Sequence, residues 1–174
     1  MTSVGINGLG RIGRLLTRRL FERHDARAAL RLTMCNEVAD AATVAHLLKY
    51  DSTHGRFSQP VVTDGDHLNI VDQAVLLTHE TAQSKVRWSD RDVNIVIDCT
   101  GVEFNRSSAA QHLGGSVSRV MLSQPASTDV DGTIIWGLND STLTPDMSVI
   151  SAGSCTSNAL MPVLSVIDEA FGIR

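Results

Sequence analysis

Short apolar runs alternate with longer amphipathic segments along most of the chain. Val4–Ile6 is an apolar run, and residues 11–23 follow it with apolar side chains on one helical face. Leu30–Asn36 predicts a second strand, and Ala39–Leu48 predicts a second helix. This alternation indicates βαβ units and a mostly parallel, doubly wound sheet of the α/β class. The apolar positions of the first helix are Ile12, Leu15, Leu16 and Leu20.

The middle of the chain departs from this alternation of strands and helices. Between Val61 and Thr78 short apolar or alternating runs are separated by Asp64-Gly65-Asp66, which predicts short antiparallel strands inserted into the larger sheet. The βαβ pattern then resumes with a buried-type strand at Val93–Ile97 and a polar helix that ends near Leu113. Further strands are predicted at Val120–Leu122, Thr133–Trp136 and Val149–Ser151.

The last segment is again apolar at helical spacing and begins at residues 154–158, SCTSN. Gly172 is a typical residue at the end of a helix. Pro162 predicts a kink or a locally broken turn, because its nitrogen cannot donate to the carbonyl of Asn158. The regularly spaced apolar residues are Leu160, Leu164, Ile167 and Phe171.

Composition narrows the classes of function. The 174 residues are 43% hydrophobic and 20% charged, as is usual for a soluble globular protein. The net charge of −4 argues against nucleic acid or an anionic membrane as the main partner. Six arginines lie between Arg11 and Arg27, and we interpret them as a solvated helix face. No apolar stretch reaches the length of a membrane span and no signal-type core precedes Val4, so we expect a cytoplasmic protein.

Three cysteines, Cys35, Cys99 and Cys155, are odd in number and far apart, which does not fit a disulfide framework. Cys35 and Cys99 lie in or at the end of apolar strands and are predicted to be core residues. No Cys/His pair has the spacing of metal ligands, so we expect no metal.

A glycine-rich loop is the first candidate for chemistry. Residues 8–13, GLGRIG, follow a predicted strand and open a predicted helix, the context in which this motif binds dinucleotides. Gly8 permits the tight turn, Gly10 lets the backbone approach a pyrophosphate, and Gly13 allows close packing of helix and strand. The phosphates would lie at the positive end of the helix.

An acidic residue stands where a ribose contact is expected. Glu37 ends the second strand, and a carboxylate there accepts hydrogen bonds from ribose hydroxyls and repels a 2′-phosphate, which favours NAD over NADP. The alternative is that Glu37 only stabilises the N-terminus of the next helix. The ends of the third and fourth strands, Thr100-Gly101 and Ser123, are expected to lie near the nicotinamide half of the cofactor.

Cys155 is the candidate nucleophile. A thiol at a helix N-terminus meets unpaired N–H groups and a positive dipole end, which favour the thiolate. A thiolate can add to an aldehyde, and the Cys155 N–H can stabilise the resulting oxyanion. The neighbouring hydroxyls of Ser154 and Thr156 could hold phosphate oxygens. The alternative is an inert, buried cysteine.

Four segments together resemble the phosphorylating glyceraldehyde-3-phosphate dehydrogenase family, and the resemblance runs in order through the whole chain. The segments are residues 7–14 (NGLGRIGR), 49–55 (KYDSTHG), 98–102 (DCTGV) and 154–158 (SCTSN). By this resemblance Cys155 matches the catalytic thiol, and Ser154 and Thr156 match residues near the phosphate or water. The matched NAD-site residues are Gly8, Gly10, Arg11, Ile12, Gly13, Glu37, Thr100, Gly101 and Ser123.

Within the family, several segments are most similar to the D-erythrose-4-phosphate dehydrogenase subgroup. The implied reaction oxidises erythrose 4-phosphate to 4-phosphoerythronate, with glyceraldehyde 3-phosphate oxidation as the close alternative. A semialdehyde dehydrogenase is a more distant option, against which residues 49–55 argue. The segments that carry this resemblance are residues 36–42 (NEVADAA), 46–51 (HLLKYD), 123–125 (SQP) and 129–135 (DVDGTII).

The resemblance also divides the chain into domains. It implies an NAD-binding domain over residues 1–152 and the start of a catalytic domain, with the nucleophile helix, over residues 153–174. The family's general-base histidine, main substrate-phosphate ligands and tetramer-forming loop follow the segment that matches Arg174. We therefore expect the intact enzyme to be a homotetramer and this chain alone to bind NAD without significant turnover. A non-catalytic NAD-binding module is the alternative of another class.

Overall fold

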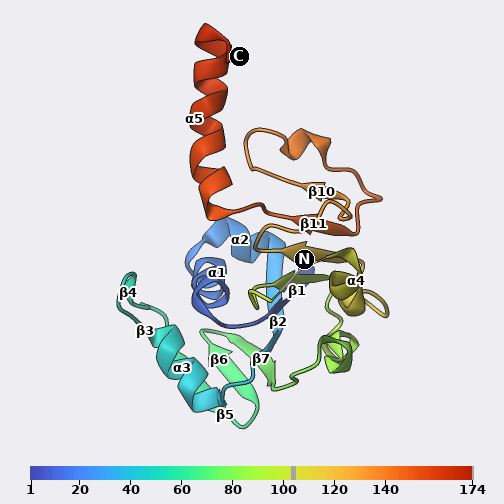
Figure 1. Ribbon diagram of the computed structural model, residues 1–174. Helices are drawn as coiled ribbons and strands as arrows, with labels where there is room; N and C mark the ends of the chain where they lie inside the picture. Colours follow the sequence, from blue (N-terminus) through green and yellow to red (C-terminus); the bar gives the residue numbers. More distant parts are fainter. Residues whose placement is uncertain (103–104, 174) are drawn as a thin grey trace.

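The computed structural model describes residues 1–102 and 105–173 (Figure 1). The helices are α1 (Arg11–Glu22), α2 (His24–Ala29), α3 (Ala41–Lys49), α4 (Arg106–Ala109) and α5 (Cys155–Phe171). The strands are β1 (Thr2–Asn7), β2 (Leu30–Asn36), β3 (Tyr50–Asp51), β4 (Gly55–Arg56), β5 (Val61–Asp64), β6 (His67–Ile70), β7 (Gln73–Thr78), β8 (Ile95–Asp98), β9 (Arg119–Leu122), β10 (Gly132–Thr133) and β11 (Val149–Ser151). Short 3₁₀ turns lie at Gln83–Lys85, Trp88–Arg91, Ala110–His112 and Asp140–Thr142.

One large sheet organises the described residues. Its nine strands lie in the order β10-β11-β9-β8-β1-β2-β7-β6-β5. From β10 to β7 all neighbours are parallel, whereas β5, β6 and β7 pair antiparallel. Successive strands build outward from β1 in both directions, first through β2 and later through β8, so the strand order reverses at β1. The predicted doubly wound α/β sheet with inserted antiparallel strands is confirmed.

The carboxyl ends of the central strands are aligned. In the β1 register, Asn7 pairs with Asn36 of β2 on one side and with Asp98 of β8 on the other. Asn36 in turn pairs with Thr78 of β7, and Asp98 pairs with Leu122 of β9. The polar residues that end β7, β2, β1 and β8 therefore lie next to one another along one edge of the sheet, where doubly wound proteins bind ligands.

Two apolar clusters cover the faces of the sheet. The first joins strand residues such as Ile6 to side chains of α1 and α3, including Phe21 and Leu48. The second joins Val96 and its neighbours to Trp88 and other residues of the loops around α4. Helices and loops on both faces are required because a parallel sheet is buried on both sides.

The elements of the first half follow the sequence pattern closely, with four differences. β2 has the predicted bounds, but α2 and the small β3–β4 hairpin were not predicted. Ile12 is 53% exposed because it lies in the first turn of α1, beyond the end of the sheet. Arg18 is buried, so the solvated-face interpretation of the arginines is wrong at that position. Its guanidinium donates to the carbonyls of Leu48 and Gly55 and lies over the Phe57 ring.

The second half departs further from the pattern. The strand predicted at Thr133–Trp136 is only the two-residue β10, because the chain turns away after it and leaves Trp136 80% exposed. The predicted polar helix is the single turn α4 followed by a 3₁₀ turn, Ala110–His112. The beginning of that predicted helix includes Glu103 and Phe104, and the predicted catalytic segment ends at Arg174. These three residues lie outside the described residues.

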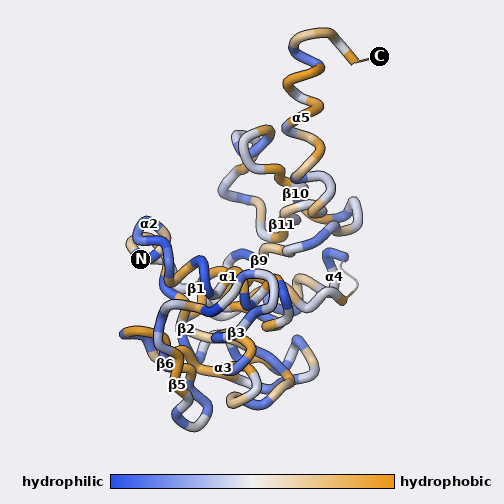
Figure 2. The backbone as a smooth tube through the Cα atoms, turned by 90° about the vertical axis from the view of Figure 1, so that its left-hand side faces the viewer, coloured by the Kyte–Doolittle hydropathy of each residue, from blue (hydrophilic) through white to orange (hydrophobic). Residues whose placement is uncertain are grey.

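Helix α5 projects from the rest of the chain (Figure 1). It runs without interruption through Pro162 and ends at Gly172, so a locally broken turn is not observed. None of its residues is buried, although most are apolar, as the orange stretch of the tube shows (Figure 2). No helix within residues 1–102 and 105–173 has the length and apolar character needed to cross a membrane.

Candidate functional site

The loop between β1 and α1 has the geometry that its glycines predict. Gly8 has φ +86°, and a Cβ there would lie 2.9 Å from the backbone nitrogen of Thr100. A Cβ at Gly13 would lie 2.0 Å from the carbonyl oxygen of Gly8, so the first turn of α1 packs directly on the loop. A Cβ at Gly10 would meet nothing within 4 Å. Gly10 therefore keeps open space in front of the loop, where a phosphate could approach the backbone.

Glu37 holds this loop from the end of β2. Its carboxylate accepts a hydrogen bond from the Leu9 N–H at 2.7 Å and one from the Ala39 N–H at 3.3 Å. The helix that follows is capped by a different acid, because Asp40 accepts from the Thr43 N–H. Glu37 is therefore not the capping residue of this helix, and its two bonds lie in the loops before α1 and α3. The geometry leaves carboxylate lone pairs for a ribose and ties their position to the glycine loop.

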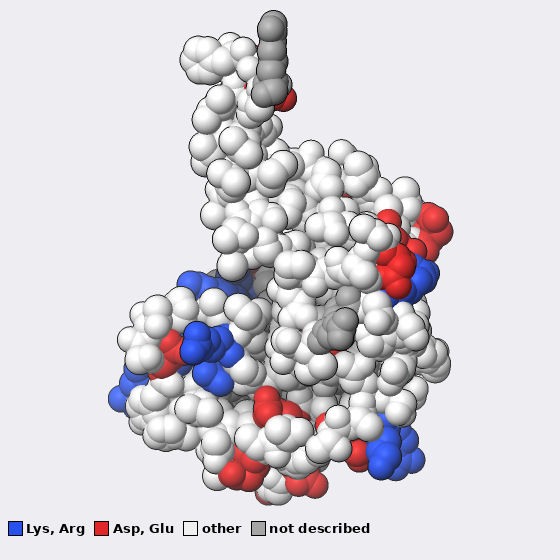
Figure 3. All heavy atoms as spheres, in the orientation of Figure 1, with Lys and Arg blue, Asp and Glu red and all other residues white. Residues whose placement is uncertain are grey.

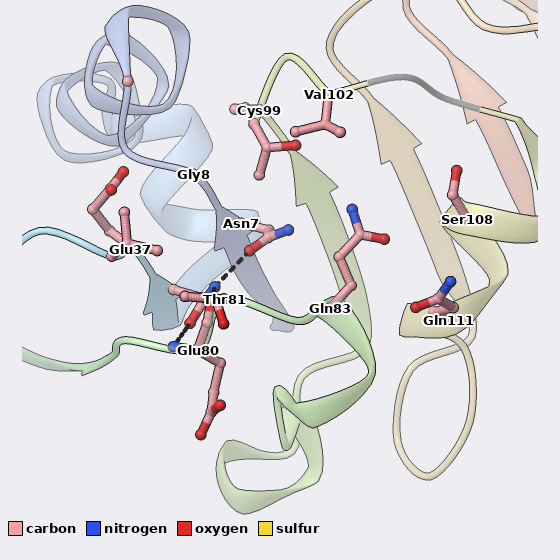
Figure 4. A pocket seen from close by; sticks show the side chains of 14 residues that line it. Asn7, Gly8, Glu37, Glu80, Thr81, Gln83, Cys99, Val102, Ser108 and Gln111 are labelled. Carbon is pink, nitrogen blue, oxygen red and sulfur yellow. Dashed lines mark hydrogen bonds between the residues drawn. The ribbon is translucent and has the colours of Figure 1, made fainter.

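A cavity of about 560 Å³ lies over the carboxyl ends of β1, β2 and β8. This volume falls in the usual range of cofactor and ligand sites. Four of the predicted cofactor residues line it: Gly8, Gly10, Glu37 and Thr100. Figure 4 shows Glu37 on one side of Asn7, with Ser108 and Gln111 on the other. The remaining lining residues are Asn7, Asn36, Val38, Glu80, Thr81, Gln83, Cys99, Val102, Ser108 and Gln111.

The other predicted cofactor residues lie around this cavity without lining it. Gly13 acts through its packing on Gly8, and Arg11 and Ile12 occupy the exposed first turn of α1. Gly101 has φ +74° in the loop after β8. Ser123 follows β9, and its N–H donates to the carbonyl of Asp98 at 3.0 Å. Their proposed contacts with a cofactor stay predictions.

A row of hydrogen-bonded side chains forms the floor of the cavity. Asn36 donates from Nδ2 to Oδ1 of Asn7 at 2.9 Å, and Asn7 donates from Nδ2 to Oδ2 of Asp98 at 2.8 Å. Asn36 is fixed in turn, because its Oδ1 accepts from the Glu80 N–H and the Thr78 hydroxyl. The row spans four neighbouring strands, so it fixes the positions of the strand ends from which the loops of the site begin.

Asp98 is the final acceptor of that row and is fully buried. Besides Asn7 it accepts from His112 Nε2 at 3.0 Å and from both the N–H and the hydroxyl of Thr100, at 2.9 and 2.7 Å. Burial raises the pKa of the Asp98 carboxyl, but these hydrogen bonds outweigh burial and leave its pKa below the ordinary value. Asp98 is thus ionised, and it holds Thr100 against the cavity.

The three cysteines differ sharply in environment. Burial raises the pKa of Cys99 to about 11, and burial also raises the pKa of Cys35. Both thiols are buried and free, which confirms their prediction as core residues. Cys155 is exposed, so its alternative reading as a buried cysteine is wrong.

Cys155 is the first residue of α5, which follows β11 at the same edge of the sheet as the cavity. Ser154 caps this helix: its Oγ accepts from the Ser157 N–H at 2.9 Å and lies 2.8 Å from the Thr156 hydroxyl. The N–H groups of the first helical turn have no partner within the helix. Cys155 is not among the residues that line the cavity. The arrangement therefore presents a thiol and two hydroxyls beside unpaired donors at a helix N-terminus.

The residues present fit a dinucleotide. Gly10 leaves the loop open, α1 directs its N-terminus at that space, and Glu37 lies on the β2 side of the cavity. Sequence reasoning missed Asn7, Asn36 and Glu80 as site residues. A signal was available for the first two, since a polar residue that ends an apolar parallel strand faces the ligand edge.

The comparison with known protein families agrees with this geometry. A family model described as "Glyceraldehyde 3-phosphate dehydrogenase, NAD binding domain" matches residues 2–106, which is more than half of the chain. The matched range contains the glycine loop, Glu37 and Thr100, and it stops before Cys155.

Proposed function

The chain belongs to the glyceraldehyde 3-phosphate dehydrogenase family and takes NAD as its cofactor, and we propose that it is the NAD-binding, nucleophile-bearing part of an enzyme that oxidises a phosphorylated aldose through Cys155. The observation that carries the proposal is the exposed Cys155 thiol at the start of α5, at the same sheet edge as the NAD cavity. The segments at 36–42 and 129–135 favour erythrose 4-phosphate as the aldose and 4-phosphoerythronate as the product.

The Cys155 thiolate adds to the aldehyde carbon and forms a thiohemiacetal, whose oxyanion the unpaired N–H groups of the first helical turn stabilise. NAD, when bound, accepts the hydride that leaves this carbon. Cys155 is left as a thioester, which water or phosphate cleaves to release the product and restore the thiolate. Ser154 and Thr156 are proposed to hold phosphate oxygens, because their hydroxyls lie beside the thiol at a helix N-terminus.

The two proposed domains follow one another along the chain. Residues 1–152 form the NAD-binding domain, and residues 153–174 begin a catalytic domain with the nucleophile helix. The enzyme is proposed to assemble as a homotetramer in the cytoplasm, with a small sugar phosphate as its ligand and no nucleic acid or membrane partner.

A trapping experiment tests the role of Cys155. The chain is incubated with NAD and erythrose 4-phosphate, and intact-mass spectrometry is combined with absorbance of the reduced cofactor. The proposal expects, without continued turnover, a single acylation of Cys155 and a matching amount of NADH, both lost in Cys155→Ser but kept in Cys99→Ser. An adduct that persists in Cys155→Ser would overturn it.

Two alternatives give different results in the same experiment. Glyceraldehyde 3-phosphate would replace erythrose 4-phosphate as the better substrate, and added phosphate would release an acyl phosphate. A non-catalytic NAD-binding module would bind NAD yet form no adduct with either sugar. Its Cys155 would also show no faster alkylation at neutral pH than expected for an ordinary exposed thiol.

A further inference from the structure

A second titratable group lies behind the cofactor cavity. His112 is fully buried, and its Nε2 lies 3.0 Å from Oδ2 of Asp98. On the other side of the ring, Trp88 donates from Nε1 to Nδ1 of His112 at 3.0 Å. The three side chains come from β8, the turn after α4 and the turn at Trp88–Arg91, and they form a continuous chain of hydrogen bonds.

These contacts determine the protonation state of His112. An indole N–H can only donate, so Nδ1 of His112 must accept and carries no proton. An ionised carboxylate can only accept, so Nε2 must carry the proton and donate to Asp98. His112 is therefore a neutral imidazole in its Nε2–H form, and a second proton on Nδ1 would break the bond to Trp88.

The Asp98–His112 pair consequently carries one net negative charge. All four hydrogen-bond donors to Asp98 are neutral groups, and no Lys or Arg within the described residues forms a salt bridge with it. Asp131 provides a contrast, because its carboxylate also has several donors but is paired with Arg106. A buried charge without a counter-ion acts over longer distances than an exposed or paired charge.

This charge lies at the end of β8, where the doubly wound fold would place the nicotinamide half of a dinucleotide. Glu37 ends β2 and lies on the adenosine side, and a dinucleotide crosses the point where strand order reverses, toward β8. Asp98 ends β8 and holds Thr100, which lines the cavity and packs against Gly8. The oxidised nicotinamide ring carries a positive charge that the reduced ring lacks.

We propose that the Asp98 carboxylate, held by neutral His112, makes the cavity bind the oxidised form of NAD in preference to the reduced form. The effect is electrostatic and needs no contact between Asp98 and the cofactor. It would favour release of the reduced cofactor after oxidation of a substrate. The inference rests on NAD binding by this family and does not depend on the chemistry of Cys155.

The first test concerns His112 in the unmodified chain. Nitrogen-15 NMR of the imidazole distinguishes the neutral Nε2–H form from the imidazolium. We expect the Nε2–H form, both without cofactor and with NAD. An imidazolium under the conditions of the binding measurements would cancel the charge of Asp98 and overturn the proposal.

The second test measures the dissociation constants of NAD⁺ and NADH in matched variants. Asp98→Asn is expected to raise the ratio of the NAD⁺ constant to the NADH constant by about three- to tenfold, because it removes the charge at nearly constant volume. Asp131→Asn removes a hydrogen-bonded carboxylate that is neither part of the Asp98 network nor among the residues lining the cavity, and it should leave the ratio unchanged. Equal weakening of both forms in Asp98→Asn would overturn the proposal.

His112→Gln covers the case in which Asp98→Asn does not fold. Glutamine retains a neutral N–H donor for Asp98, so the ratio should stay within about twofold of the parent value. A ratio that falls well below the parent value would show that His112 had been neutralising Asp98, and it would contradict the proposal. Failure of the parent chain to bind either form would instead count against the assignment of the cavity to NAD.

Discussion

The carboxyl edge of β1, β2 and β8 and the helix α5 both carry chemistry, but they are held in very different ways. At the edge, buried side chains from four strands are joined by hydrogen bonds, and Asn7 and Asp98 are almost fully buried. α5 has no buried residue and projects as a nearly uncharged surface (Figure 3). The cofactor site is therefore organised by long-range contacts, whereas the direction of Cys155 depends on local ones: the cap at Ser154 and the bonds from Asn158 Nδ2 to the carbonyls of Ala152 and Ser154.

Two phenylalanines give the sharpest comparison of the regions. Phe57 is 1% exposed and Phe171 is 86% exposed. Phe57→Ala should lower the free energy of unfolding by about 3–5 kcal/mol, because it leaves a cavity under α1 and α3. Phe171→Ala should change it by less than about 0.5 kcal/mol. Urea denaturation measures both, and similar losses would show that α5 is packed as firmly as the sheet.

Gly13→Ala is expected to have the next largest effect. A Cβ 2.0 Å from the Gly8 carbonyl must displace either the loop or α1, at a cost of about 1–3 kcal/mol in stability. NAD affinity should fall as well, because the loop moves. Gly10→Ala is the control: its Cβ meets nothing in the chain, so it should weaken NAD binding with little loss of stability. Calorimetry and thermal unfolding separate the two quantities, and a stable Gly13→Ala with unchanged affinity would refute the packing argument.

A smaller effect is expected at Glu37. Glu37→Gln keeps the shape of the side chain but removes the negative charge that accepts the hydrogen bond from the Leu9 N–H. The glycine loop is then held less firmly, so NAD affinity should fall by about tenfold. Glu80→Gln serves as the comparison, since Glu80 also lines the cavity but no hydrogen bond joins its carboxylate to the described loop. The NAD affinity of the Glu80→Gln variant should change by less than about twofold. The assignment fails if the two variants weaken NAD binding equally.

The smallest effect is expected at the cap of α5. Ser154→Ala removes the acceptor of the Ser157 N–H, which should cost about 1 kcal/mol locally. Because α5 contributes little to the packed core, global stability should stay nearly constant while amide exchange in the first turn of α5 accelerates. The rate of Cys155 alkylation reports on the same turn, and no change in either rate would mean that the cap does not position the thiol.

The sequence predicted the fold because its local patterns agree with the tertiary structure. β2 ends where predicted, at Asn36, where the apolar run of a buried parallel strand gives way to a polar residue. Gly8 and Gly13 could be assigned from their spacing because a close backbone approach tolerates only glycine. The family match over residues 2–106 is consistent with these assignments.

What the sequence did not predict depends on contacts between distant segments. The sequence pattern predicts Arg18 on a solvated helix face. In the structure its guanidinium is buried, where it donates to the carbonyls of Leu48 and Gly55 and lies over the ring of Phe57. His112 gives no local signal, because its partners Asp98 and Trp88 are 14 and 24 residues away. Such polar networks depend on how the whole sheet brings distant segments together, so the hydrophobic pattern of one segment does not predict them.

Titration of the isotope-labelled chain with NAD⁺, followed by amide NMR, tests the central claim most directly. The account predicts saturable shifts at Gly8, Gly10 and Thr100 and at the residues around Glu37, with the amides beyond the first turn of α5 unchanged. Shifts centred instead on the second cavity, beside Lys49 and Arg56, or no saturable shift at all, would contradict it.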